Sequence, residues 1–137
     1  MTIVGFDPAV ARANGYPTRS TGGDVRAQGQ VFGNCGFSYV DLYDVGPRRY
    51  HMDTGFGLKL AAVKYKWSVR ITAPSYAKTW KYSGPLAFRT TWTNSPDGYD
   101  TIPVAAYASA IVTTGTAILV NGVVCASGQP TDLEAIY

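Results

Sequence analysis

Turn-forming residues interrupt this chain roughly every 7 to 12 residues along most of its length. The interruptions include Gly22-Gly23, Gly46-Pro47 and Gly84-Pro85, and the short segments between them are rich in Val, Tyr, Thr, Phe and Trp. Short β-prone segments at this spacing are typical of a β-sandwich or barrel. We therefore predict an all-β protein, a single antiparallel β-sandwich of about seven to nine strands.

The length and apolar content are those of one domain. The chain has 137 residues, of which 46% are hydrophobic and 15% are charged, which is enough for one core without help from metals. We expect residues 1–137 to form a single domain. The longest apolar runs are broken by Gly115 and Asn121-Gly122, so none approaches the roughly 18 residues of a membrane-spanning helix.

One short helix is expected near the N-terminus, as an addition to the strands. Asp7 is suited to cap the free backbone N–H groups of a turn that begins at Pro8. Asn14-Gly15 then supplies a left-handed stop.

The clearest strand covers residues 63–71. Its apolar side chains alternate with Lys64, Lys66 and Arg70, so one face is apolar and the other cationic. The phase of the alternation inverts upstream, and a bulge near Ala61-Ala62 would join the two halves.

The clearest hairpin covers residues 116–127. Asn121-Gly122 between two apolar runs is a strong signal for a two-residue turn, because both central residues of a type I′ turn need positive φ. That turn would place Ile118 opposite Cys125. Both faces of the hairpin are apolar, so we expect it in the middle of the fold.

Cys35 and Cys125 are the only cysteines. An even number of cysteines in an extracellular type of chain predicts one disulfide, with two buried thiols as the alternative. Two cysteines and a single distant histidine lack the paired short spacings of a zinc site. We expect no metal and no cofactor.

The compartment is inferred from composition. Met1-Thr2-Ile3-Val4 shows neither the basic nor the apolar segment of a secretion signal. The protein is therefore intracellular or phage-borne, or Met1 replaces a removed leader. Abundant glycine and tyrosine with a single glutamate favour a secreted protein.

Positive charge is concentrated in one part of the chain. Residues 48–89 hold nine basic residues against Asp53 alone, a local net charge of +8, whereas the whole chain has +3. Because Lys64, Lys66 and Arg70 share a strand face, and adjacent strands should add Lys78, Lys81 or Arg89, we expect a cationic sheet face. Ordinary solvated strand residues that discourage edge pairing are the alternative.

Three aromatic residues are candidate surface binders. Trp80 and Tyr82 lie in one segment with Lys78 and Lys81, and Tyr99 lies in a predicted turn. Exposed rings can stack on sugars or bases and are favoured at protein interfaces. Tyr65 and Trp67, by contrast, are expected in the core.

Motifs for catalysis are largely missing. A serine hydrolase needs a nucleophile, a base and an orienting group, but His51 is the only histidine and there is no Gly-x-Ser-x-Gly elbow. His51 and Asp53 share a strand face and form a possible acid–base pair. No glycine-rich phosphate loop is present. We expect no enzyme activity and no catalytic residue.

The segment Asp7-Pro8-x-x-Ala11-x-Ala13-Asn14-Gly15-Tyr16, which leads into a glycine-rich β-chain with a cysteine pair, resembles the mature start of small secreted proteins of Gram-positive filamentous bacteria. The match covers about ten residues. Some such proteins are small subunits of secreted antibacterial assemblies, so the resemblance implies secretion and a protein partner. The motif defines no binding residue.

These observations predict a secreted, non-catalytic binding or adaptor module that acts through a cationic face and aromatic-bearing loops. Its partner would be a protein or an anionic cell-surface polymer, while a glycan is a further candidate and nucleic acid is not expected. The alternatives are a carbohydrate-binding domain that uses Trp80, Tyr82 and the loop 97–100, a cationic antimicrobial or toxin protein, and a phage structural protein.

Overall fold

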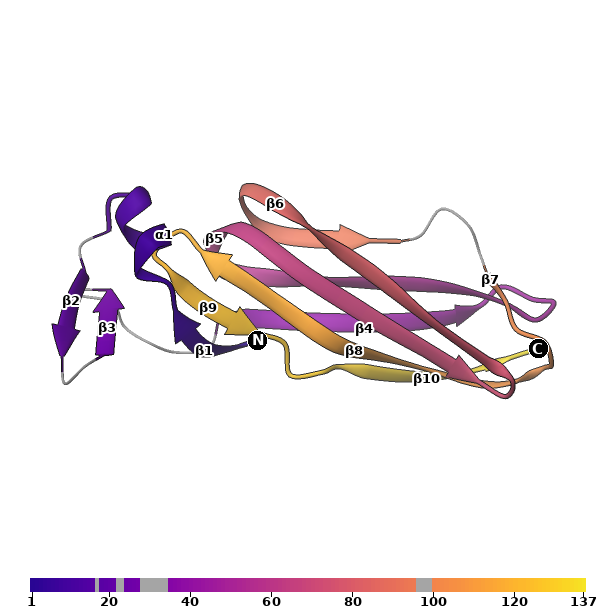
Figure 1. Cartoon of the computed structure of the whole chain (residues 1–137). Coiled ribbons are helices and arrows are strands. Elements are labelled where there is room, and N and C mark those ends of the chain that lie inside the picture. The colour runs from indigo at the N-terminus through magenta and orange to yellow at the C-terminus, as the bar shows by residue number, and fades with distance from the viewer. Residues whose placement is uncertain (17, 22–23, 28–34, 96–99) are drawn as a thin grey trace.

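The computed structural model of the chain describes residues 1–16, 18–21, 24–27, 35–95 and 100–137. Within these ranges the protein is built from antiparallel strands and one short helix, α1 (Pro8–Ala13) (Figure 1). The strands are β1 (Thr2–Phe6), β2 (Thr18–Thr21), β3 (Asp24–Ala27), β4 (Gly36–Asp44), β5 (Arg49–Ala73), β6 (Tyr76–Asn94), β7 (Asp100–Thr101), β8 (Ala106–Leu119), β9 (Val123–Ala126) and β10 (Thr131–Ile136).

Eight of these strands belong to one folded sheet that is not closed into a barrel. Its order is β1-β9-β8-β5-β4, with β10 paired to β8, and with β6 and β7 paired to β5. The strands β2 and β3 form a separate two-stranded sheet next to α1. The predicted all-β antiparallel class with a short N-terminal helix is thus confirmed.

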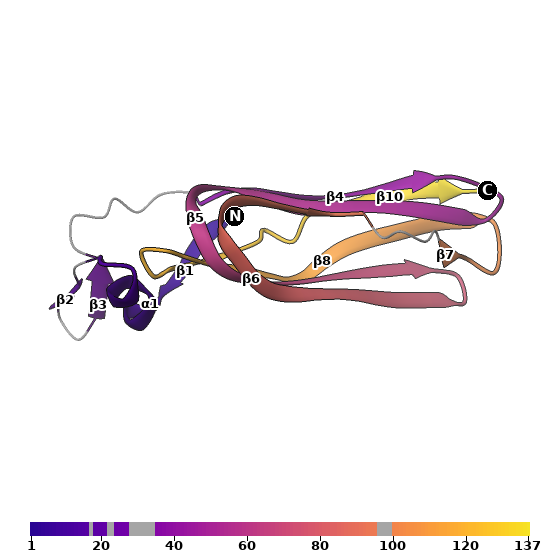
Figure 2. The same ribbon diagram turned by 90° about the horizontal axis from the view of Figure 1, so that it is seen from above.

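The long strands β5 and β6 pass from one layer of the sandwich to the other. Residues 54–57 of β5 pair with 91–94 of β6, and residues 64–73 pair with 76–85. Layer 1 therefore contains β4, the first half of β5 and the end of β6. Layer 2 contains the second half of β5, the start of β6, β8, β9 and β1. Figure 2 shows the two layers running side by side along the molecule.

Both strands bend at the end of the molecule that carries α1. The pairing of β5 with β6 shifts register on each side of Ala62, and opposite this point Ala87 and Phe88 adopt φ values of 51° and 60°. A bulge bends a strand and raises its twist. The predicted bulge near Ala61-Ala62 is therefore present, although the strand predicted for residues 63–71 is only part of the longer β5.

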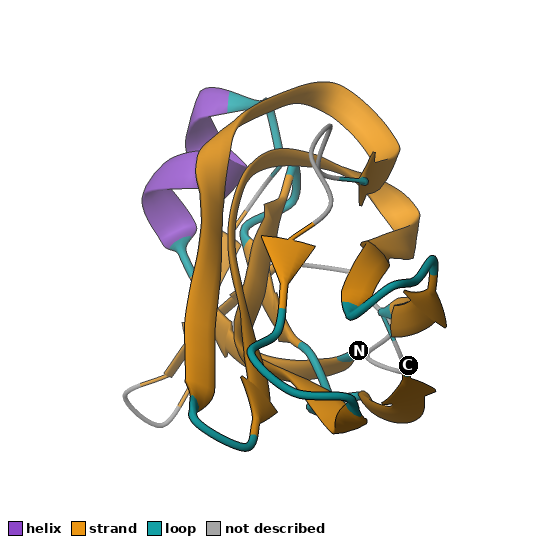
Figure 3. Cartoon of the chain, turned by 90° about the vertical axis from the view of Figure 1, so that its right-hand side faces the viewer, coloured by secondary structure: helices purple, strands orange, loops and turns teal. Residues whose placement is uncertain are grey.

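The core lies between the two layers (Figure 3). Trp67 of layer 2 packs against Phe56 of layer 1, with ring centroids 5.2 Å apart, and both side chains are 1% exposed. The Trp67 indole N–H donates to the hydroxyl of buried Thr54 (2.8 Å), which in turn donates to the carbonyl of Tyr39 (2.9 Å). This chain of hydrogen bonds connects the two layers through the core.

The helix forms as predicted. The Asp7 carboxylate accepts from the N–H groups of Ala9 and Val10 at 3.0 and 3.3 Å, and Pro8 is the first helical residue. The helix ends at Ala13, Asn14 is its C-cap, and Gly15 follows with φ 80°.

The hairpin of β8 and β9 forms, but its predicted register was wrong by one residue. Ala117, rather than Ile118, lies opposite Cys125. The loop has three residues because the Gly122 N–H closes a turn onto the Leu119 carbonyl at 2.9 Å and Gly122 then has φ 88°. A type I turn followed by a left-handed residue is the usual form of a three-residue loop.

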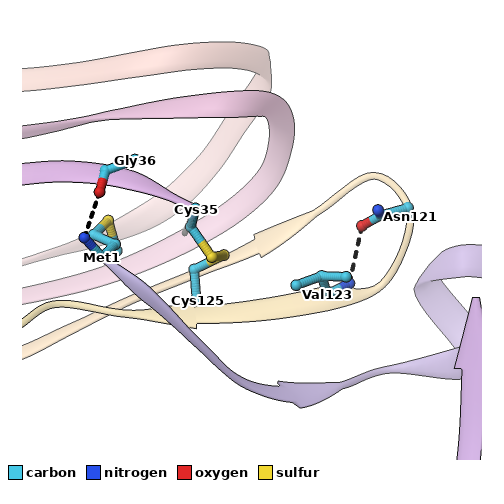
Figure 4. The surroundings of a disulfide bond; sticks show 6 residues. All are labelled: Met1, Cys35, Gly36, Asn121, Val123 and Cys125. Carbon is cyan, nitrogen blue, oxygen red and sulfur yellow. Dashed lines mark hydrogen bonds between the residues drawn. A yellow bond between two sulfur atoms is a disulfide. The ribbon is translucent and has the colours of Figure 1, made fainter. Parts of the chain in front are cut away.

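Cys35 and Cys125 form the predicted disulfide, and both residues are buried. The bond joins the start of β4 to β9, across 90 residues of sequence (Figure 4). The Met1 amino group donates to the Gly36 carbonyl beside it, and burial lowers the pKa of this amine. A disulfide of this kind is compatible with an extracellular protein.

Candidate binding faces

Four cationic side chains lie together on the outer side of layer 2. Lys64, Lys66 and Arg70 alternate along β5 with buried residues, and all three are exposed. Lys81 of β6 joins them because it pairs with Ser68, which lies between Lys66 and Arg70 on the same side of the strand. We call these four residues the cationic face.

The charges of the cationic face are not neutralised by ion pairs to the described residues. Within the described part of the chain, none of its four side chains forms an ion pair. The β8 residues opposite Lys64, Lys66 and Arg70 are uncharged, namely Ile118, Thr116 and Ile111. Four cations on one side of a sheet therefore present an unopposed positive potential to solvent.

Three other predicted site residues point to the opposite side of the sheet. Lys78, Trp80 and Tyr82 pair with the buried residues of β5, and so lie on the side that faces layer 1, where Lys78 is exposed and the two rings are half-buried. The expectation that Trp80 and Tyr82 are surface binders therefore needs correction. They lie within β6, where alternation turns their half-buried rings inward, and not in exposed loops.

The partners of these inward side chains are internal. The ammonium group of Lys78 lies 4.0 Å from the centroid of the Trp80 ring, and the Trp80 indole N–H donates to the Tyr50 hydroxyl at 3.3 Å. Burial raises the pKa of Tyr82 to about 12, with smaller contributions from neighbouring tyrosines. These contacts support the sandwich and leave the cationic face to Lys64, Lys66, Arg70 and Lys81.

The last predicted binder, Tyr99, lies outside the described residues. The glycan site expected from Trp80, Tyr82 and loop 97–100 therefore has two inward members and a loop that falls largely outside the described ranges.

A row of aromatic side chains that the sequence reasoning missed lies on the outer side of layer 1. Phe37, Tyr39 and Tyr43 of β4 project outward, since buried Val40 and Leu42 point into the core. His51 of β5 pairs with Tyr43 and stacks on it, with centroids 5.9 Å apart. We call Phe37, Tyr39, Tyr43 and His51 the aromatic row.

Glycine lets two of these rings approach the sheet. A side-chain carbon on Gly57 would fall 2.5 Å from the Phe37 ring, and one on Gly55 would fall 3.0 Å from the Tyr39 hydroxyl. The Phe37 ring therefore lies against the β5 backbone, and its side chain is 63% exposed. The alternation of Phe37, Tyr39 and Tyr43 around Val40 and Leu42 was the signal available in the sequence.

Carboxylates lie within the aromatic row. Asp41 pairs with Asp53 across β4 and β5, and the charge of Asp41 is the main cause of the raised pKa of Tyr43. The pKa of Tyr39 is also raised, mainly by burial and to a smaller extent by the negative charge of Asp53. The outer side of layer 1 is thus acidic and aromatic, whereas that of layer 2 is cationic.

The expected pairing of His51 with Asp53 is present. The His51 Nε2 atom lies 2.9 Å from Asp53 Oδ1, and the Ser95 hydroxyl donates to the same carboxylate oxygen. The pair lies on the sheet surface beside Tyr43, so Asp53 fixes the orientation of the imidazole that stacks there.

In the described residues there is no group of three or more His, Cys, Asp or Glu side chains arranged to hold a metal ion. No helix among those residues is long and apolar enough to cross a membrane.

Comparisons of the chain with protein-family profiles, curated proteins and solved structures found no match. A function for this chain therefore has to be inferred from the geometry of its two outer faces.

Proposed function

We propose that this protein is a secreted, non-catalytic binding module that captures an anionic partner on its cationic face. The observation that carries the proposal is the gathering of Lys64, Lys66, Arg70 and Lys81 on one exposed side of layer 2, with no ion pair to another described residue. A buried disulfide, which belongs to oxidising compartments, supports an extracellular place of action.

The partner that fits this face is a cell-surface polymer rich in phosphate or carboxylate, or an acidic protein surface in an extracellular assembly. Steering by unopposed charge speeds the encounter with such a partner and weakens as salt screens it. The hydrogen-bonded strands set the spacing between the backbones that carry these cations, while the exposed side chains themselves lose rotamer freedom when a partner orders them.

Charge reversal tests this proposal. In the variant Arg70→Glu/Lys81→Glu, the affinity for immobilised polyphosphate should fall about 30-fold or more, given roughly 1 kcal/mol per cation at an anionic surface. The matched control Lys59→Glu/Arg89→Glu makes the same change in net charge at exposed residues outside the face. Equal affinities for the two variants, or no binding by the native chain even at low salt, would refute the proposal.

A second candidate function, glycan binding, is favoured by the aromatic row. An exposed ring that lies along the sheet, as Phe37 does over Gly57, offers a flat apolar surface to a sugar ring. Asp41 and Asp53, which lie further along the same outer side between Tyr39 and Tyr43, supply hydrogen-bond acceptors for sugar hydroxyls.

A glycan array distinguishes this second candidate from the first. Phe37→Ala/Tyr43→Ala should lose binding to any glycan that the native chain retains, whereas Phe88→Ala should keep it. Phe88 is a suitable control because it is 62% exposed, like Phe37, but lies at the bend of β6. A native chain that retains no glycan, or equal loss in both variants, would exclude the aromatic row as a sugar site.

A further inference from the structure

An apolar groove opens on the outer side of layer 2, at the end where β5 and β6 bend. It has a volume of about 810 Å³, which is in the range of small-molecule sites, roughly 300–1,000 Å³. Its apolar lining comes from α1 and four strands, and includes Val10, Val63, Pro85, Ile118 and Val124. We call this feature the outer groove.

The strand register explains why the outer groove crosses the sheet. Pro85 of β6 pairs with Lys64 of β5, Lys64 pairs with Ile118 of β8, and Ile118 pairs with Val124 of β9. These four residues form one row across four strands, about 14 Å long at the usual strand spacing of about 4.8 Å. Val10 of α1 adds a further wall.

Two apolar residues of the outer groove, Ile118 and Val124, do not belong to the core. Ile118 and Val124 alternate with the buried residues Ala117, Leu119, Val123 and Cys125, so they point away from the interior. Further along the same outer side, the corresponding β8 residues are Thr116 and Thr114. Between Thr114 and Ile118 the outer side of β8 therefore changes from polar to apolar as it approaches α1.

The described lining of the outer groove is positively charged. It includes Lys64 and Lys66, and no acidic residue is found among the described lining residues. The groove thus continues the cationic face, and the two features share these lysines. A simple anion would leave the apolar row uncovered, and an uncharged apolar molecule would leave the two ammonium groups without a partner.

We propose that the outer groove binds a single-chain anionic amphiphile of the fatty-acid type. Its hydrocarbon chain lies along Ile118 and Val124, and its carboxylate lies between Lys64 and Lys66. This inference rests on the proposed function, since it names one ligand class for the cationic face. It also adds a requirement that the cationic face alone does not have, namely that affinity depends on chain length.

The native protein is tested first, by titration calorimetry with octanoate, decanoate and dodecanoate below their micelle concentrations. Each buried methylene contributes about 0.8 kcal/mol, so each added pair should tighten the dissociation constant about 15-fold until the groove is full. The methyl ester of dodecanoate should bind at least tenfold more weakly than the acid. Affinity that is independent of chain length, or equal for acid and ester, would overturn the proposal.

A variant on β8 and β9 locates the site. Ile118→Thr/Val124→Thr keeps β-branched side chains that suit strands and should weaken dodecanoate binding about tenfold or more. The control Ile111→Thr makes the same exchange on the outer side of β8, beside Arg70 and away from the groove. Folding of each variant is checked by circular dichroism, and equal affinity in the two would place the ligand elsewhere.

The same samples separate this inference from the proposed function. Polyphosphate binding without dodecanoate binding refutes the outer groove as a fatty-acid site and leaves the cationic face intact. Dodecanoate binding with polyphosphate affinity that is unaffected by Arg70→Glu/Lys81→Glu refutes the cationic face as a polymer site. If the native chain is a dimer that Ile118→Thr/Val124→Thr dissociates, and no dodecanoate binds, a second copy occupies the groove and the proposal is wrong.

Discussion

The variant Thr54→Val should destabilise the protein, although valine and threonine have nearly the same shape. Thr54 is fully buried, and its hydroxyl accepts from the Trp67 indole N–H at 2.8 Å and donates to the Tyr39 carbonyl at 2.9 Å. Valine removes both hydrogen bonds and opens no cavity. The variant thus tests the contribution of these two hydrogen bonds to stability separately from that of the packing around Thr54.

The size of the effect depends on the groups that lose their partners. A buried donor without a partner costs about 1–3 kcal/mol, and the Trp67 residue is 1% exposed, so water does not replace the lost acceptor. The Tyr39 carbonyl loses one partner as well. Part of this destabilisation is offset, because the variant no longer has to remove the Thr54 hydroxyl from water on folding. We expect a net decrease of about 2–3 kcal/mol in the free energy of unfolding, or roughly 8–12 °C in Tm.

Chemical denaturation followed by circular dichroism, with the disulfide intact, measures this decrease. Thr54→Ser retains the hydroxyl and should lose only about 1 kcal/mol for its missing methyl group. The decisive comparison uses Trp67→Phe as background, where there is no indole N–H to leave unpaired, and where Thr54→Val should cost less than about 1 kcal/mol. If Thr54→Val costs the same in both backgrounds, the hydrogen bond is not the source of the stability.

Two further predictions concern the disulfide and Tyr82. Cys35→Ser/Cys125→Ser should lower the free energy of unfolding by about 4–5 kcal/mol, because the bond closes a loop with a sequence separation of 90 residues. Reduction of the native protein should give the same loss in a denaturant titration. A loss under about 1 kcal/mol would contradict the loop-entropy argument. The folded-state pKa of Tyr82, about 12, lies above the ordinary value of about 10, so its contribution to stability is fully present below pH 10 and is lost as the pH rises towards 12. Tyr82→Phe should flatten this alkaline decline in denaturant titrations, and an unchanged decline would show that other groups cause it.

Local sequence signals determined several features of this protein. Asp7, Pro8 and Gly15 are enough to predict α1, because capping, a fixed φ and a left-handed stop act within a few residues. The alternation in residues 63–71 likewise predicted which side chains share a face, because side chains of a strand alternate with period two. The cysteine count predicted the disulfide in the same way, without reference to the rest of the fold.

Long-range packing decided what these signals left open. Alternation shows that Trp80 and Tyr82 share a face but not which face meets the other layer, and that was set by their pairing with buried residues of β5. The three-residue hairpin loop is in contact with a distant segment: the Asp7 N–H donates to the Gly122 carbonyl at 2.6 Å, and a side-chain carbon on Gly122 would fall 2.2 Å from the Asp7 carbonyl oxygen. The dipeptide Asn121-Gly122 alone carries no information on this contact.

The candidate binding sites also have some features that follow from the local sequence and others that depend on the tertiary structure. The sequence by itself determined that Lys64, Lys66 and Arg70 lie on one side of a strand, since that depends only on the local strand period. Only the tertiary structure brought Lys81 to these three and aligned Pro85, Lys64, Ile118 and Val124 into one groove. The reason is physical: a groove across strands depends on the register between segments far apart in the chain, and register is fixed by how all the strands pack together.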